Sequence, residues 1–154
     1  MDTYWRNNIT NQVFILDPNS SLENYDGYTL MTDLQITQYN LQLKKPIRKQ
    51  YITNKRIQLA EKSFIEYNGN NYYNSQNSRI AIISYVMSLT AQNTGTFFTY
   101  PNQTSIQLKK SDFLAIWSNI QTNEINLRLQ EKDAFSKIDN AITIDEINAI
   151  DISL

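Results

Sequence analysis

Residues 64–73 read Phe-Ile-Glu-Tyr-Asn-Gly-Asn-Asn-Tyr-Tyr, and this stretch fixes the first recognisable unit of the fold. Asn68-Gly69 stands between two runs of aromatic and apolar residues, which is the strongest short-range signal of a β-hairpin. The pair suits a tight hairpin turn because both central residues need positive φ, which Asn and Gly tolerate best. The sequence therefore predicts an antiparallel hairpin here.

The segment after this hairpin predicts a short helix. Residues 75–78 supply N-cap side chains. Ile80, Ile83 and Met87 then recur at helical spacing, which predicts an apolar face on a helix that ends near Gly95.

A second hairpin and two further helices complete this half of the chain. Residues 96–100 and 105–108 are expected to pair as strands around a turn at 101–103. Ser111 is expected to cap a long helix, extended after a bend by Phe135 and Ile138. Thr143 to Glu146 reads as a capping box that opens a final short helix. The apolar face of the long helix comprises Phe113, Ile116, Trp117, Ile120 and Leu127, and Trp117 is therefore expected in the core.

Upstream of residue 47 the pattern changes to short strands and one helix. Residues 13–16 and 25–31 read as extended segments, the first ended by a Pro-containing turn. Thr32 and Gln35 form a capping box. A helix should follow, with a break or restart near Lys45, because the ring of Pro46 disfavours a continuing helix.

Residues 47–62 combine helical apolar spacing with seven Lys and Arg side chains in and just before the segment. A charge run of this kind is usually a solvated helix face, and the alternative is an anion-binding patch. We favour the solvated face.

Composition excludes several classes of function. The 154 residues include 14 Lys and Arg against 15 Asp and Glu, a near-neutral balance that argues against a nucleic-acid binder. The absence of Cys and His removes the commonest metal ligands, the thiolate nucleophile and any Ser-His triad. We expect no cofactor, no metal site and no catalytic residues. No run approaches the roughly 20 apolar residues of a membrane span, so we expect no membrane insertion.

Three residues near the start of the chain are candidates for partner binding. Tyr4, Trp5 and Arg6 are of the residue types that anchor protein interfaces. The alternative, that they fold back onto a core, has equal weight. The tyrosines at 67, 72, 73 and 100 fall on predicted strands, where aromatic residues pack well in any case.

The order of these signals resembles a small domain of unknown function that lies at the C-terminal ends of tailed-phage tail-fibre proteins. The resemblance covers residues 47–150, and residues 27–33 look like a linker motif that precedes the domain in short phage tail proteins. The matching pieces are Arg56, Phe64 to Gly69, Tyr73, Ser78 to Ile80, Gly95 to Phe98, Asn102, Ser105 to Lys109, Asp112-Phe113 and Lys137 to Ile147. A long fibre shaft does not precede the domain here, which favours a stand-alone tail or baseplate accessory protein.

We therefore expect an α+β protein, in which a short N-terminal strand-rich module precedes helices and two β-hairpins packed as one small domain. Residues 1–31 would form the docking module, 32–46 a helix and linker, and 47–154 the tail-fibre-type α+β domain.

The resemblance implies a non-enzymatic component of a phage tail, made in the host cytoplasm and carried in the virion. Its expected partners are other tail proteins and further copies of itself, as a dimer or trimer, with a host surface receptor left open. A tail-fibre assembly chaperone is the alternative, and a carboxylate-dependent glycan-degrading tail enzyme a third.

Overall fold

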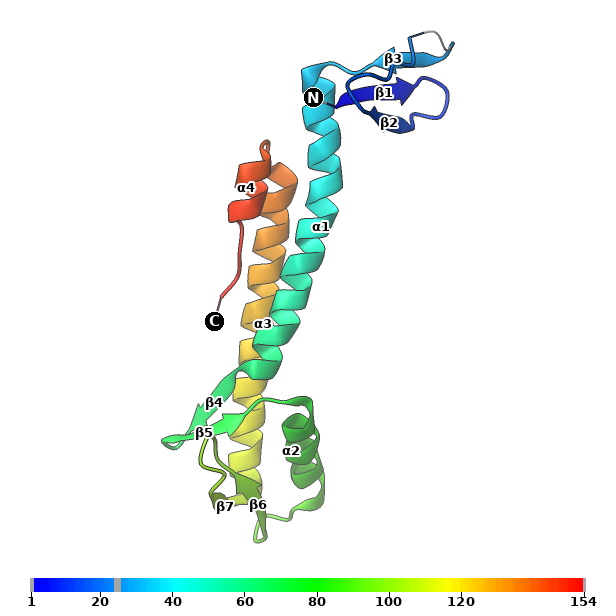
Figure 1. Ribbon diagram of the computed structural model, residues 1–154. Helices are drawn as coiled ribbons and strands as arrows, with labels where there is room; N and C mark the ends of the chain where they lie inside the picture. Colours follow the sequence, from blue (N-terminus) through cyan, green and yellow to red (C-terminus); the bar gives the residue numbers. More distant parts are fainter. Residues whose placement is uncertain (1, 24–25, 154) are drawn as a thin grey trace.

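Two long helices form the axis of the molecule, and small β-sheets lie toward its two ends (Figure 1). The computed structural model describes residues 2–23 and 26–153. Its elements are, in order, β1 (Thr3–Asn7), β2 (Val13–Leu16), β3 (Tyr28–Leu30), α1 (Asp33–Lys62), β4 (Phe64–Tyr67), β5 (Asn70–Tyr73), α2 (Gln76–Ser88), β6 (Thr94–Phe98), β7 (Ser105–Lys109), α3 (Lys110–Asn140) and α4 (Ile144–Ala149). The α+β class predicted from the sequence is confirmed.

The N-terminal strands form an antiparallel sheet in the order β2-β1-β3. Trp5 on the central strand lies opposite Phe14 on one side and Leu30 on the other. The predicted strand at 13–16 is confirmed. The predicted extended segment at 25–31 contains strand β3, and its first residue, Tyr25, lies outside the described residues. The Thr32–Gln35 capping box then opens α1, because each residue satisfies a backbone N–H of the other.

The helix α1 is 30 residues long and continues through Pro46 without a break, so the predicted break near Lys45 is wrong. Proline costs a helix one hydrogen bond and crowds the preceding turn. Tertiary contacts on both sides of the proline offset that cost. Lys45 donates to the carbonyl oxygen of Asp139 at 2.7 Å, and Arg48 donates to the carbonyl oxygen of Ile150. Pro46 itself is exposed, so its ring does not disturb this packing.

Both predicted hairpins are present as two-stranded antiparallel sheets. In the first, Asn68 and Gly69 have φ of 50° and 71°, as the Asn-Gly turn requires. An isolated bridge between Asn71 and Tyr100 connects the two hairpins.

The helix α2 buries a different face from the one predicted. Ile82 is fully buried, whereas Ile80, Ile83 and Met87 are 56%, 39% and 80% exposed. Residues 80–87 are apolar almost all round the helix, so spacing alone cannot select the inner face. The helix also ends at Ser88 rather than near Gly95, because residues 94–98 are needed as strand β6.

The helix α3 runs unbroken from Lys110 to Asn140, and strand β7 leads directly into it. Lys109 is therefore the N-cap in place of the predicted Ser111, and its backbone N–H donates to the carboxylate of Asp112 at 2.8 Å. The predicted capping box at Thr143 and Glu146 is confirmed.

The core has two parts, both of which contain α3. One lies between the hairpins, α2 and the first half of α3, and it includes Phe113, Ile116 and Ile120 of the predicted helix face, with Trp117 packed at its edge. Leu127, the last residue of that face, is also buried but lies outside this cluster. The other lies where α1, the second half of α3 and the C-terminal segment meet, around Ile52 and Ile138. A third apolar group around Trp5 lies in the N-terminal sheet.

Candidate functional site

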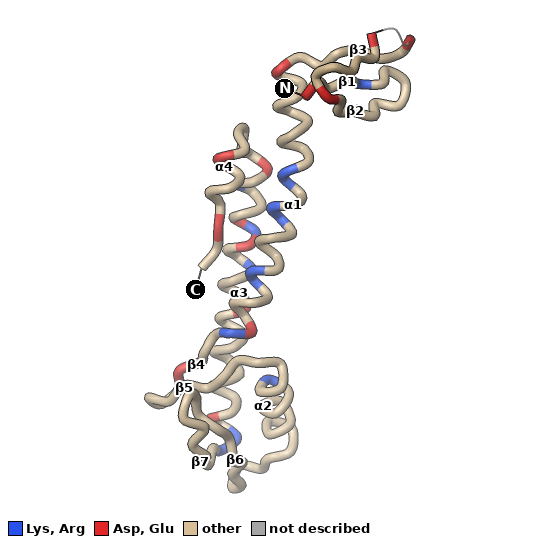
Figure 2. Tube along the Cα trace, viewed as in Figure 1, with Lys and Arg blue, Asp and Glu red and all other residues tan. Residues whose placement is uncertain are grey.

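Five of the seven basic side chains of α1 bind acidic groups or carbonyl oxygens of this same chain: Lys45, Arg48, Lys49, Lys55 and Arg56. Figure 2 shows Lys and Arg along α1 beside Asp and Glu of α3 and the C-terminal segment. Neither interpretation of the basic run from the sequence, a solvated helix face or an anion-binding patch, anticipates these contacts, because the acidic partners are 68 or more residues away in the sequence. The pairs with α3 run antiparallel: Lys49 with Asp139 at 2.7 Å, and Arg56 with Glu131 and Glu124 at 2.9 Å each. Lys55 pairs with Asp151 of the C-terminal segment.

The pair formed by Lys55 and Asp151 fixes the C-terminal segment to α1. The hydrogen bond from Lys55 lowers the pKa of the Asp151 carboxyl below its ordinary value, and the backbone N–H of Ile152 adds to the effect. The next residue, Ile152, is buried in the core, so an ion pair and an apolar contact at adjacent positions hold the C-terminal segment in place.

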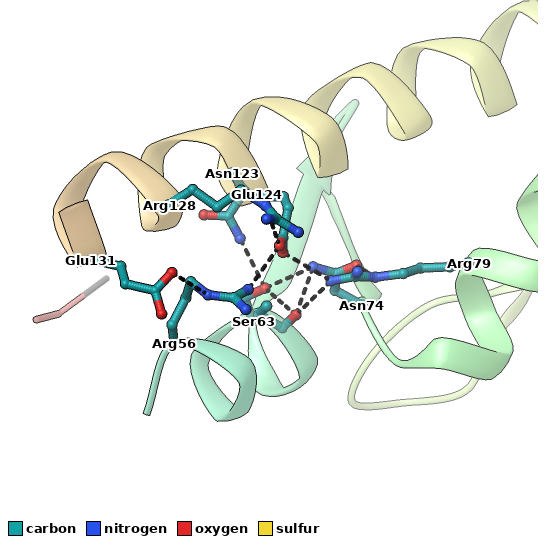
Figure 3. A network of polar contacts seen from close by, with 9 residues as sticks. Arg56, Ser63, Asn74, Arg79, Asn123, Glu124, Arg128 and Glu131 are labelled. Carbon is teal, nitrogen blue, oxygen red and sulfur yellow. Dashed lines mark hydrogen bonds and ion pairs between the residues drawn. The ribbon is translucent and has the colours of Figure 1, made fainter. Parts of the chain in front are cut away.

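A polar network crosses the middle of the molecule and joins three elements to α3 (Figure 3). Arg56 lies between Glu124 and Glu131, and the three side chains are only 13%, 17% and 16% exposed. Glu124 also contacts Arg128 at 3.1 Å and Arg79 at 4.0 Å. These contacts hold α1 and α2 in fixed positions against α3.

The buried end of this network fixes the first hairpin. Asn74 is 1% exposed, and its amide donates to the carbonyl oxygen of Ala60 and to the hydroxyl of Ser63 at 2.9 Å. Its side-chain oxygen accepts from Arg79 at 2.9 Å. Because Asn74 follows Tyr73 directly, this anchoring sets where the last residue of the hairpin lies.

Glu124 and Glu131 are two acidic residues that the fold brings together, and the sequence did not single them out. A glycosidase needs one carboxyl group free to give up a proton and a second free to attack or to activate water. Both oxygens of Glu131 are engaged, one by Arg56 and the other by the hydroxyl of Thr53 at 2.7 Å. Arg56, Arg128 and Arg79 surround Glu124. The pair is arranged for structure rather than for proton transfer.

A group of solvent-exposed aromatic rings lies at the hairpins, and we call Phe64, Tyr73, Phe98 and Tyr100 the aromatic surface. The four residues are 45%, 41%, 58% and 43% exposed. Phe64 and Tyr73 face one another across the hairpin, and Tyr100 stacks on Phe64 with ring centroids 4.3 Å apart. Tyr73 and Tyr100 are also stacked, at 5.7 Å. The four rings therefore form a solvent-exposed apolar surface and are not part of the buried core.

A hollow of about 470 Å³ opens beside this surface. Tyr73, Phe98 and Tyr100 form its apolar wall, and Asn77 and Gln103 contribute amide groups. The described residues that line it carry no charged side chain. Volume and lining fall within the range of ligand pockets, which are mostly apolar with a few polar groups.

The sequence signalled this site only in part. Strand alternation distinguishes Tyr72, which is 1% exposed and part of the core, from its neighbour Tyr73, which points outward. Tyr67 donates to the Asp112 carboxylate at 2.8 Å, and this bond raises the pKa of Tyr67 above its ordinary value. Of the four tyrosines on predicted strands, Tyr73 and Tyr100 thus belong to the aromatic surface, although Tyr100 lies just beyond the end of β6. Their meeting depends on the contact between hairpins, which no local pattern encodes.

The N-terminal candidates separate from one another in the structure. Trp5 is 4% exposed and packs inside the small sheet, so it folds onto a core and offers little to a partner. Tyr4 and Arg6 are half-buried, and the ring of Tyr4 meets that of Tyr39 edge-on at 6.4 Å. This contact joins the sheet to the start of α1.

The described residues contain no group of three or more acidic, His or Cys side chains that could hold a metal ion. Within residues 2–23 and 26–153, every helix is too short or too polar to cross a membrane. Comparison with protein families, with curated proteins and with solved structures gives no significant match.

Proposed function

We propose that this protein is a non-enzymatic structural component of a bacteriophage tail, a fibre or baseplate accessory subunit that docks on other tail proteins and associates with itself. The resemblance of residues 47–150 to tail-fibre C-terminal domains motivates the proposal. The observation that carries it is a line of exposed apolar residues on the outer face of α1.

This outer line comprises Leu43, Ile47 and Ile57, which are 48%, 64% and 42% exposed. At 100° per residue they lie within a narrow sector of the helix, opposite the buried Ile52 that faces α3. Gln50 and Asn54 fill the positions between them and hydrogen-bond to each other at 3.0 Å.

The spacing of this line supports association between helices. Leu43, Gln50 and Ile57 are seven residues apart, and Ile47 and Asn54 repeat the same interval. Apolar residues at heptad spacing form the seam of a coiled coil, and amides within the seam select register and copy number. A helix of 30 residues is about 45 Å long, which offers enough length for a lasting contact.

The oligomeric state tests the self-association. Sedimentation velocity of the full chain should report a dimer or trimer, and Ile47→Glu should convert it to a monomer, because a charge in an apolar seam is desolvated without a partner. Met87→Glu is the matched control, since Met87 is 80% exposed on α2 and away from the line. A wild-type monomer at high concentration, or an unchanged Ile47→Glu oligomer, would contradict this part of the proposal.

Mass spectrometry of purified particles from cells that produce the protein tests the assignment to a tail. A fixed multiple of a known tail protein is the expected result, and the multiple reports the symmetry. The second candidate, a tail-fibre assembly chaperone, is favoured by the same exposed apolar residues, because a chaperone keeps such a surface open in its free form. Abundance in the lysate with absence from particles would favour the chaperone, and absence from both would overturn the phage assignment.

A further inference from the structure

We propose that the aromatic surface and its hollow bind a neutral oligosaccharide. The inference concerns this pocket alone and does not depend on the assignment to a phage tail. Its starting point is the lining: three exposed rings and two amides around a space of about 470 Å³.

The aromatic wall suits the C–H faces of sugar rings. An aromatic ring carries partial negative charge on its faces and attracts the weakly positive C–H groups that a pyranose presents on one side. Phe98 and Tyr100 are 58% and 43% exposed, so a large part of each side chain is accessible to a ligand even though Tyr100 also stacks on Phe64. The stack of Tyr100 on Phe64 fixes the ring in place, which reduces the entropy lost on binding.

The polar groups suit hydroxyls rather than ions. Asn77 and Gln103 are exposed, and neither side chain hydrogen-bonds to any residue that the structure describes. An amide both donates and accepts, so it can match a sugar hydroxyl, which does the same. With no charge among the described lining residues, a phosphate or carboxylate ligand would be desolvated without compensation.

A bound peptide strand is less suited to this place, because the backbone N–H groups of Thr99 and Tyr100 beside the pocket are already paired. The N–H of Thr99 donates to the carbonyl oxygen of Thr104 at 3.0 Å, and that of Tyr100 donates to the carbonyl oxygen of Asn71 at 2.7 Å. A peptide that adds to a sheet needs unpaired backbone groups at the edge.

A second hollow of about 360 Å³ adjoins the first and shares Tyr73 and Asn77 with it. Its lining adds Glu61 and Lys62, one charge of each sign, so it contributes no net charge. A ligand that occupies both hollows must pass over Tyr73. This continuity favours a chain of several sugar units over a monosaccharide.

Calorimetric titration of the full chain with maltotetraose, cellotetraose, chitotetraose and mannotetraose tests the inference, with tetragalacturonate as the anionic counterpart. At least one neutral tetramer should bind saturably below about 10 mM and at least about tenfold more tightly than its monosaccharide. Failure of every neutral tetramer at that concentration, or equal or tighter binding of tetragalacturonate, would overturn the inference.

Two variants link binding to this pocket. Tyr100→Ala should weaken the tetramer about tenfold or more, and Tyr51→Ala should leave binding unchanged, since Tyr51 is similarly exposed at 45% but lies on α1. Asn77→Ala provides an independent check, because that side chain is exposed and makes no hydrogen bond to the described residues; it should weaken binding several-fold. Full binding by a folded Tyr100→Ala or by Asn77→Ala would refute the site.

Discussion

Removal of the Arg56 guanidinium should destabilise the protein far more than removal of any exposed arginine. Arg56 contacts Glu124 and Glu131 at 2.9 Å each, and all three side chains are more than four-fifths buried. Loss of one partner from a buried ion pair costs about 3–5 kcal/mol, because the remaining charge stays desolvated. The substitution Arg56→Met keeps the apolar length of the side chain, so packing changes little.

The magnitude follows from what each carboxylate retains. Glu124 keeps Arg128 at 3.1 Å, so its share of the loss is small. Among residues 2–23 and 26–153, Glu131 keeps only the hydroxyl of Thr53 as a polar side-chain partner, so most of the cost arises there. The lower end of the range is therefore appropriate, about 3 kcal/mol. In a chain of this length that corresponds to a fall in Tm of about 6–12 °C.

Urea unfolding followed by far-ultraviolet circular dichroism measures this loss. The matched control is Arg128→Met, which removes the same kind of side chain from the same Glu124 but from a position 64% exposed. An exposed pair contributes about 0–1 kcal/mol, so the control should change little. A double-mutant cycle of Arg56→Met with Glu131→Gln should show coupling above about 1 kcal/mol. Equal losses from Arg56→Met and Arg128→Met, or no coupling, would refute the reasoning.

Three further outcomes are expected. Gly95→Ala should lower the free energy of unfolding in urea by about 1–3 kcal/mol, because its Cβ would lie 2.6 Å from ring carbons of Tyr85. When Tyr85→Ala is already present, the further loss caused by Gly95→Ala should be smaller. Gly69→Ala should cost about 1–2 kcal/mol through its φ of +71° alone, since its Cβ meets no atom within 4 Å; a neutral result would contradict the turn geometry. Asp151→Asn should lower the free energy of unfolding at pH 7, because it removes the charged partner of Lys55. The difference from wild type should disappear as the pH falls below 3.8 and through the lowered pKa of Asp151, because wild-type Asp151 is then protonated too, and a pH-independent difference would contradict this.

Local sequence signals predicted much of the secondary structure correctly. The Asn68-Gly69 turn and the capping boxes at Thr32 and Thr143 involve residues at most three positions apart, so the backbone conformation follows from the residues themselves. Most of the buried face of α3 was also predictable, because Phe113, Ile116 and Ile120 recur at helical spacing, although Leu114, Ile125 and Leu129 lie outside that face and are exposed.

Two errors arose where distant contacts override a local preference. Pro46 favours a break, but the contacts of Lys45 and Arg48 with residues about a hundred positions later hold the helix together. In α2 an apolar sequence all round left the inner face undecided, and packing against β6 and α3 selected Ile82.

The candidate site was the least predictable part, because it is assembled from segments that the chain order keeps apart. Tyr73 ends the first hairpin, Asn77 lies in the first turn of α2, and Gln103 lies in the turn of the second hairpin. Each looks ordinary in its own segment. For Trp5 the sequence left an interface role and a place in a core with equal weight, and it is buried because the strands on both sides of it supply apolar neighbours.

The sequence by itself determined the Asn68-Gly69 turn, the helix starts at Thr32 and Thr143 and the α+β class, since these depend on backbone preferences and hydrogen bonds a few residues apart. Only the tertiary structure decided that the basic face of α1 binds acidic groups of α3 and the C-terminal segment, that α1 continues through a proline, and that exposed rings from two hairpins share one hollow. The physical reason is that burial and ion pairing act between residues near in space, and the free energy of those contacts exceeds the local preferences that a sequence displays.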